Sequence, residues 1–202
     1  MNDIESIKHP QLDYKIHPLI TARWSPRAYD IRPVEPEKLQ RIFEAARWSA
    51  SSSNLQPWYF LVGFNGDDVY SKIFKTLVEF NRLWVVNAPV LVLAIAKTTS
   101  SKGEPNNYAA YDLGQAVATL SLQAKEEGIY THQMGGFDTA QAALSLEIPP
   151  EYKVMVAITL GYRGEAEKLH PNLLKLELSP RTRRPVAESV FTASFGHKAD
   201  FL

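Results

Sequence analysis

The sequence of 202 residues contains no cysteine. Disulfide bonds, thiolate nucleophiles, zinc ribbons and cysteine-ligated iron–sulfur clusters are therefore excluded, and a cytoplasmic location is the expectation. The five histidines are dispersed, and neither an HExxH motif nor two histidines one helical turn apart occur. We expect no metal site, because metal-binding helices present such pairs on one face.

The chain also lacks a net charge, because 22 Lys and Arg balance 22 Asp and Glu. No overall field attracts it to nucleic acid or to an anionic membrane. No apolar run approaches ~20 residues, and the N-terminus has no apolar core of signal-peptide length. We therefore expect neither nucleic acid nor a membrane as a partner, and any anion site must be local.

Several familiar ligand-binding and catalytic motifs are absent. No GxGxxG follows a predicted strand, and neither a P-loop (GxxxxGK followed by Ser or Thr) nor a GxSxG nucleophile elbow occurs. These absences argue against a Rossmann fold, a P-loop NTPase and a serine hydrolase. No coupled acid–base pair is evident either, so we expect no catalytic side chain, and the reactive atoms would belong to a cofactor.

The residues that are present, 45% apolar and 22% charged, are typical of one globular domain over residues 1–202. Pro36, followed by Leu39, Ile42 and Ala46, predicts a helix that stops at the polar run after it. Other helices are predicted from Asp67, over 108–127 with Gly128 as its C-terminal cap, and after Asp138; strands are predicted at 58–64, 89–96, 129–133 and 154–160.

The predicted fold is α+β, with a central mixed β-sheet flanked by helices. Residues 89–96 are apolar without alternation, which indicates a strand buried on both faces in the middle of the sheet. Residues 1–15 form a polar N-terminal extension. Residues 163–202 form an arm that is too long for an internal loop and is either disordered or wrapped around a partner subunit; its apolar patches favour wrapping and hence a dimer.

Two basic clusters are candidates for binding a phosphate: Arg23-Trp24-Ser25-Pro26-Arg27 and Arg181-Thr182-Arg183-Arg184. Guanidinium groups match phosphate oxygens in geometry, and a serine hydroxyl satisfies a further oxygen. Each cluster on its own is also consistent with an ordinary solvated surface.

Two further segments have the composition of contacts to a planar heterocycle. The run from Ser49 to Asn54 offers small polar groups, and Gly135-Gly136 frees backbone N–H groups from any neighbouring Cβ. Helix capping and ordinary turn chemistry explain the same residues.

In order and spacing, these motifs together resemble the flavin-dependent nitroreductase family along nearly the whole chain: Arg23-x-Ser25-x-Arg27-x-Tyr29, SASSSNLQPWYF, Gly135-Gly136-Phe137-Asp138 and SPRTRRP. The resemblance implies FMN as cofactor and a homodimer with one site at each side of the subunit interface. The implied cofactor contacts are Arg23, Trp24, Ser25, Arg27, Ala50, Ser51, Asn54, Asn81, Gly135, Gly136, Arg181 and Arg183.

By this resemblance, Arg23, Ser25, Arg181 and Arg183 hold the phosphate, and Arg27 reaches the pyrimidine edge of the flavin. The positions in the SASSSN run approach it from the opposite subunit. Asn81 addresses the ring, and the Gly136 N–H approaches flavin N5. Two departures stand out: Trp84 replaces a lysine, and Gly135 a glutamate, of some relatives. The short polar loop 97–107 is similar to that of a compact member.

The implied reaction is a ping-pong hydride transfer from NADH or NADPH to FMN and then to a nitroaromatic, a quinone or a related small-molecule acceptor. No dinucleotide motif separates NADH from NADPH. Three alternatives remain: a flavin-dependent reductase or dehydrogenase for another substrate class, a flavin-storing or regulatory protein, and an interaction protein without flavin.

Overall fold

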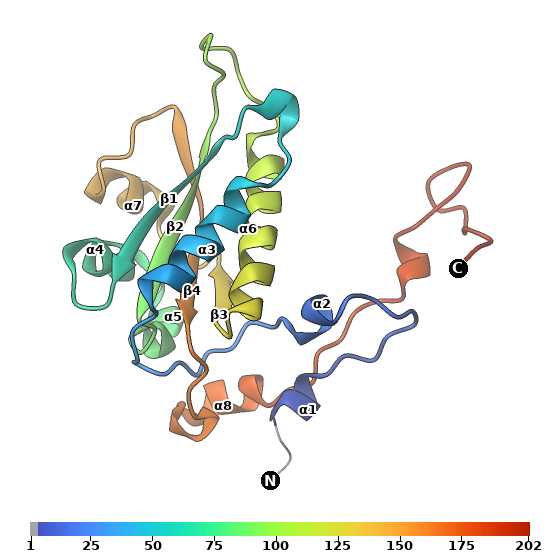
Figure 1. Cartoon of the computed structure of the whole chain (residues 1–202), viewed down its shortest axis with the longest axis horizontal. Helices are drawn as coiled ribbons and strands as arrows, with labels where there is room; N and C mark the ends of the chain where they lie inside the picture. The colour runs from blue at the N-terminus through green and yellow to red at the C-terminus, as the bar shows by residue number, and fades with distance from the viewer. Residues whose placement is uncertain (1–3) are drawn as a thin grey trace.

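A four-stranded β-sheet forms the centre of the computed structural model, which describes residues 4–202. The spatial order is β1, β2, β4, β3, and each neighbouring pair is antiparallel (Figure 1). The strands are β1 (Trp58–Phe64), β2 (Val90–Lys97), β3 (Tyr130–Met134) and β4 (Tyr152–Gly161). The α+β prediction is confirmed, whereas the expected mixed sheet is wrong for residues 4–202, whose named strands all pair antiparallel.

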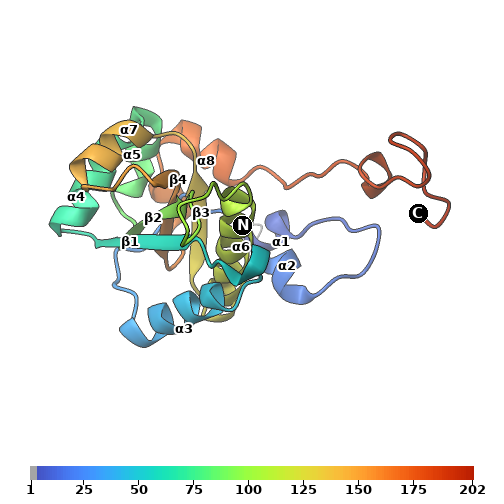
Figure 2. The ribbon, with the colours of Figure 1, turned by 90° about the horizontal axis from the view of Figure 1, so that it is seen from above.

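Helices cover both faces of the sheet, which explains why β2 lacks alternation although it is antiparallel (Figure 2). Val90, Val92 and Ala94 pack towards α3 (Pro36–Arg47) and α6 (Ala109–Glu126). The intervening Leu91 and Leu93 pack against the other helices, namely α4 (Asp68–Thr76), α5 (Glu79–Val85) and α7 (Thr139–Ser145). An apolar run therefore reports burial on both faces and not the direction of the neighbouring strands.

The helices that position the site begin and end at the residues that the sequence indicates. Pro36 opens α3 at its first turn. The side chains of Asp67 and Asp138 accept hydrogen bonds from the backbone N–H groups of Tyr70 and Gln141, and so cap α4 and α7. After α6, Gly128 adopts a left-handed φ of 73°, which glycine does without steric cost.

The N-terminal segment contains a short helix that periodicity does not predict, α1 (Ile4–Lys8). Ile4 is buried in a small cluster with Trp24 and Ala166. Five residues are too few to form an isolated helix, so these tertiary contacts stabilise α1. Residues 1–3 of the expected extension lie outside the described residues. The remaining short elements are two α-helices, α2 (Pro18–Ala22) and α8 (Pro171–Glu177), and three 3-10 helices, η1 (Ser52–Asn54), η2 (Ala166–Lys168) and η3 (Val186–Glu188).

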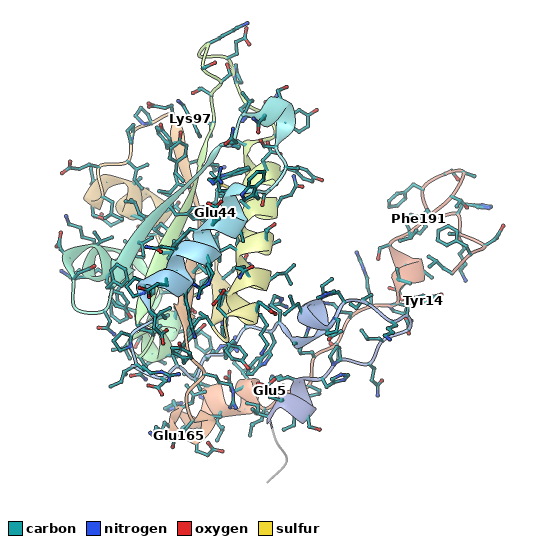
Figure 3. The ribbon with its side chains drawn as sticks, in the orientation of Figure 1. Glu5, Tyr14, Glu44, Lys97, Glu165 and Phe191 are labelled. Atoms are coloured by element: carbon teal, nitrogen blue, oxygen red, sulfur yellow. The ribbon has the colours of Figure 1, made fainter. Side chains whose placement is uncertain are left out.

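Beyond α8 the chain leaves the body of the molecule and runs beside the loop that precedes α2 (Figures 1 and 2). Tyr14 on that loop and Phe191 on the outgoing arm both lie well away from the sheet (Figure 3). Phe195 is 96% exposed and Phe201 72% exposed. Within residues 4–202, no helix is both long enough and apolar enough to cross a membrane.

Candidate functional site

The two basic clusters, distant in sequence, meet where the outgoing arm passes α2. Arg23, Arg181 and Arg183 line one open cavity of ≈ 540 Å³. The guanidinium of Arg23 donates to the hydroxyl of Ser25 over 3.5 Å. Arg181 Nη1 donates to the carbonyl oxygen of Thr21 over 2.7 Å, which ties the arm to the end of α2.

The positive charges of these arginines repel one another. Burial lowers the pKa of Arg23, and the charge of Arg183 lowers it further. Burial likewise lowers the pKa of Arg181, with the charges of Arg23 and Arg183 adding to the effect. Among the ion pairs within residues 4–202, none includes any of the three. The cluster is therefore suited to a multiply charged anion.

Arg27 lies on the turn that follows this cluster. Its Nε atom is buried and has no hydrogen-bond partner within the described part of the chain. Beside the turn, His132 of β3 places Nδ1 2.9 Å from the carbonyl oxygen of Pro26. Burial, the largest cause, lowers the pKa of His132 to about 4, and the charges of Arg27 and Arg23 act in the same direction. The imidazole is thus neutral at pH 7 and donates from Nδ1.

The far end of β3 leads into the second candidate group. The side-chain amide of Asn81 donates to the carbonyl oxygen of Gly136 over 3.0 Å. A Cβ at Gly136 would lie 2.9 Å from Asn81 Nδ2, whereas a Cβ at Gly135 would meet nothing within 4 Å. From His132 to Gly136 the chain spans at most about 13 Å. The structure therefore places these groups along β3: the basic cluster and Arg27 lie beside the strand, and the Asn81–Gly136 pair follows its end.

Two tryptophans hold this region together from inside. Trp24 is 4% exposed, and its ring meets Tyr130 edge-on at 5.8 Å. Trp84 is fully buried, with ring contacts to Tyr29 at 6.1 Å and to His132 at 4.6 Å. In each case the indole Nε1 is buried and has no hydrogen-bond partner in the described residues. Trp84, which stands where some relatives have a lysine, is thus a core position.

The remaining candidates, Ala50, Ser51 and Asn54, do not join the others within the chain. They lie at and beside η1, at the opposite end of α6 from α2 (Figure 1). Ser53, Asn54 and Gln56 have φ values of 49°, 54° and 48°. Non-glycine residues adopt this left-handed region at a steric cost, and such strain concentrates at binding sites.

A family model for the nitroreductase family matches residues 20–82 and 67–162. The chain belongs to the nitroreductase family. A crystal structure of an oxidoreductase containing FMN is 33% identical, with a TM-score of 0.88 over 93% of this chain and 96% of that chain.

Two other nitroreductases are more distant. An FMN-dependent nitroreductase from Clostridium difficile R20291 is 26% identical, with a TM-score of 0.62 over 74% of this chain and 88% of that chain. A Bacillus subtilis (strain 168) protein provisionally named NAD(P)H nitroreductase YodC is 23% identical over 71% of this chain and 87% of its own.

Three residues of the region around the basic clusters and Arg27 were not among the candidates. His132 is one of the five dispersed histidines, which form no metal motif in the sequence, and no pattern marks Lys8, which is 6% exposed beside Trp24. Glu177 is 1% exposed at the end of α8. Its signal is its spacing, because it lies one turn after the buried Leu173 and so on the apolar face of that helix.

Proposed function

We propose that the protein is an FMN-dependent oxidoreductase that takes electrons from NADH or NADPH and passes them to a nitroaromatic, a quinone or a related acceptor. The observation that carries this proposal is the convergence of Arg23, Arg181 and Arg183 in one cavity, where none of the three is in an ion pair within residues 4–202. Three guanidinium groups and the Ser25 hydroxyl fit the terminal phosphate of FMN. The FMN in the 33% identical structure supports this choice of anion.

The other end of the site fits the flavin ring. The unpartnered Nε of Arg27 offers a buried donor to the polar edge of a heterocycle. Asn81 fixes the carbonyl of Gly136 and leaves no room for a Cβ there, so the backbone N–H groups of this turn are presented without a side chain in front of them. Trp24, next to Arg23 in the sequence, packs against Tyr130 and contributes the buried Nε1 donor.

FMN would supply the hydride acceptor when bound, so the reaction would need no catalytic side chain from the protein. The chain's own groups bind and orient. The arginine cluster anchors the phosphate, Arg27 places a positive charge where reduction adds negative charge, and the Asn81–Gly136 pair fixes the turn. Gly135 is exposed and leaves the approach to the ring open, which favours acceptors of varied shape.

We further propose that the site is completed by a second subunit. The strained residues around Asn54 adjoin η1, at the opposite end of α6 from α2, the helix that precedes Arg23 (Figure 1). The arm after α8 exposes Phe195 and Phe201, and the loop before α2 exposes Tyr14, so both extended segments carry apolar surface that a partner would cover. A homodimer wrapped by these arms satisfies both features.

The decisive experiment compares FMN with riboflavin, which lacks the phosphate. The variants Arg23→Gln and Arg183→Gln, each tested as flavin-free protein, are expected to weaken FMN by roughly 10-fold to 100-fold, because a charge-assisted hydrogen bond contributes about 1.5–3 kcal/mol. Riboflavin affinity should stay unchanged. Arg41→Gln, whose arginine pairs with Glu127 on the surface, is the matched control. Equal weakening of both flavins would contradict the phosphate role.

Reduction of the flavin-loaded protein tests the second half of the proposal. Anaerobic addition of NADH or NADPH should bleach the flavin absorbance within seconds, and a quinone or a nitroaromatic should restore it. A flavin that neither nucleotide reduces would instead favour a storage protein.

A further inference from the structure

The backbone of the turn that carries Arg27 is held on both sides by side chains from distant parts of the chain. Nδ1 of His132 donates to the carbonyl oxygen of Pro26 over 2.9 Å. The backbone N–H of Arg27 donates to Glu177 Oε2 over 2.9 Å, and that of Ala28 donates to Oε1 over 3.2 Å. The carboxylate of Glu177 therefore receives two consecutive amides of the turn.

The last carbonyl of the turn is engaged as well. The oxygen of Ala28 accepts from the backbone N–H of Gly164 over 2.9 Å. A Cβ at Gly164 would lie 2.6 Å from the carbonyl carbon of Tyr29, so the two segments are in direct backbone contact. These backbone groups are satisfied, whereas the Nε atom of the Arg27 guanidinium has no hydrogen-bond partner within residues 4–202.

Burying the carboxylate of Glu177 costs desolvation free energy, which argues that its hydrogen bonds to the turn have a functional role. Glu177 is 1% exposed, and a buried carboxylate is tolerated only with hydrogen bonds and nearby cations. Burial raises its pKa, whereas the two backbone amides and the charges of Arg27 and Lys8 oppose that rise. A neutral residue of similar size would avoid the desolvation cost.

Lys8 supplies the second of those cations from the N-terminal helix. Its Nζ donates to the carbonyl oxygen of Ser179 over 2.5 Å and lies 5.0 Å from the ring centroid of Trp24. Its own carbonyl accepts from Arg181 Nη1 over 3.2 Å. Through Lys8, helix α1 thus connects the residues around Glu177 to the arginine cluster of Arg23, Arg181 and Arg183.

We propose that Glu177 is a positioning residue that fixes the backbone of Arg27 and so presents its guanidinium to the flavin ring, with Lys8 as its counter-cation. This inference rests on the proposed function, because it assigns the ring end of the site to Arg27. It differs from that function in predicting a residue that never touches the flavin and yet sets how tightly the ring is bound.

The test is a double-mutant cycle on flavin-free protein, with the dissociation constants of FMN and riboflavin both measured. Glu177→Ala and Arg27→Ala should each weaken both flavins by the same factor, roughly tenfold, because both act at the ring and not at the phosphate. The double variant should bind no more weakly than Arg27→Ala alone, since residues that act through one another are not additive. The bound-flavin absorption spectra of the two single variants should shift alike.

Glu177→Gln, which keeps the shape and one acceptor oxygen, should give an intermediate loss and decides the question if Glu177→Ala does not fold. Glu167→Gln, an exposed carboxylate on η2, is the control and should bind both flavins normally. Effects that multiply in the double variant, or a Glu177→Gln protein equal to wild type, would overturn the inference. Wild-type protein that bound neither flavin would defeat the proposed function itself.

Discussion

Asn81 and Gly136 are locked together: the asparagine amide donates to the glycine carbonyl over 3.0 Å, and the space that a Cβ would take at Gly136 lies 2.9 Å from the same amide nitrogen. Val78 Cγ2 closes the other side at 3.1 Å. The contact joins α5 to the turn after β3, so one small substitution disturbs two elements at once.

Gly136→Ala is therefore expected to displace the Asn81 side chain and to break its hydrogen bond to the Gly136 carbonyl oxygen, and losing a hydrogen bond typically costs about 0.5–1.5 kcal/mol. The free energy of unfolding, measured with urea on flavin-free protein, should fall by about that amount, and flavin affinity should fall with it. Gly135→Ala is the matched control, because its Cβ would meet nothing within 4 Å, and it should stay within about 0.5 kcal/mol of wild type. Equal effects at the two glycines would contradict the packing argument.

His132 should make the protein sensitive to acid. Burial holds its pKa at about 4 in the folded state, against 6.5 for an imidazole exposed to water. Below pH 6.5 the unfolded chain binds a proton that the folded chain refuses, so the contribution is intact above pH 6.5 and is lost as the pH falls towards 4. At 1.36 kcal/mol for each pKa unit, the loss reaches about 3 kcal/mol.

The measurement is the free energy of unfolding from pH 7.5 to 4.5 for wild type and for His132→Asn, whose amide replaces the Nδ1 donor without titrating. The wild-type value should drop more steeply through this window. Parallel curves for the two proteins would show that His132 does not titrate as its burial requires.

Much of the fold followed from local patterns. Strand β1 has the predicted bounds, and the caps Asp67 and Asp138 lie where expected, because strand length and capping depend on neighbouring residues alone. The direction of strand pairing did not follow, since β2 is apolar on both faces in either arrangement. Helix α1 was missed because its stability comes from tertiary contacts of Ile4.

The candidate site divides in the same way. Residue types with a distinctive chemistry, such as Arg23 and Arg183, were recognisable in sequence, and the fold brings them to one cavity. Lys8 and Glu177 were not recognised, because each contacts a residue far away along the chain. Lys8 bonds Ser179, 171 residues away, and Glu177 bonds Arg27, 150 residues away. The spacing of Glu177 from Leu173 indicates that it lies on the apolar face of α8, but no local pattern indicates which distant residue it contacts.

The burial of Trp84 changes what a lysine would do there. Trp84 is fully buried against Tyr29 and His132, so Trp84→Lys would leave a cavity and an unpaired cation in the core. We expect a loss of about 3–5 kcal/mol in unfolding free energy, the range for truncating a large buried aromatic. Trp84→Phe should cost clearly less. A folded lysine variant of normal stability with a raised flavin potential would instead place this residue at the flavin.

The arginine cluster makes a last prediction that needs no flavin. Because Arg23, Arg181 and Arg183 repel one another, the flavin-free protein should bind inorganic phosphate or sulfate and be stabilised by it. An anion at a hundred times its dissociation constant adds about 2.7 kcal/mol, which raises Tm by roughly 5–10 °C for a chain of this size. The rise should saturate with anion concentration, shrink in Arg183→Gln, and be absent with sodium chloride at equal ionic strength. A rise of the same size in chloride would mean that salt merely screens the repulsion, and that the cluster has no site for a phosphate group.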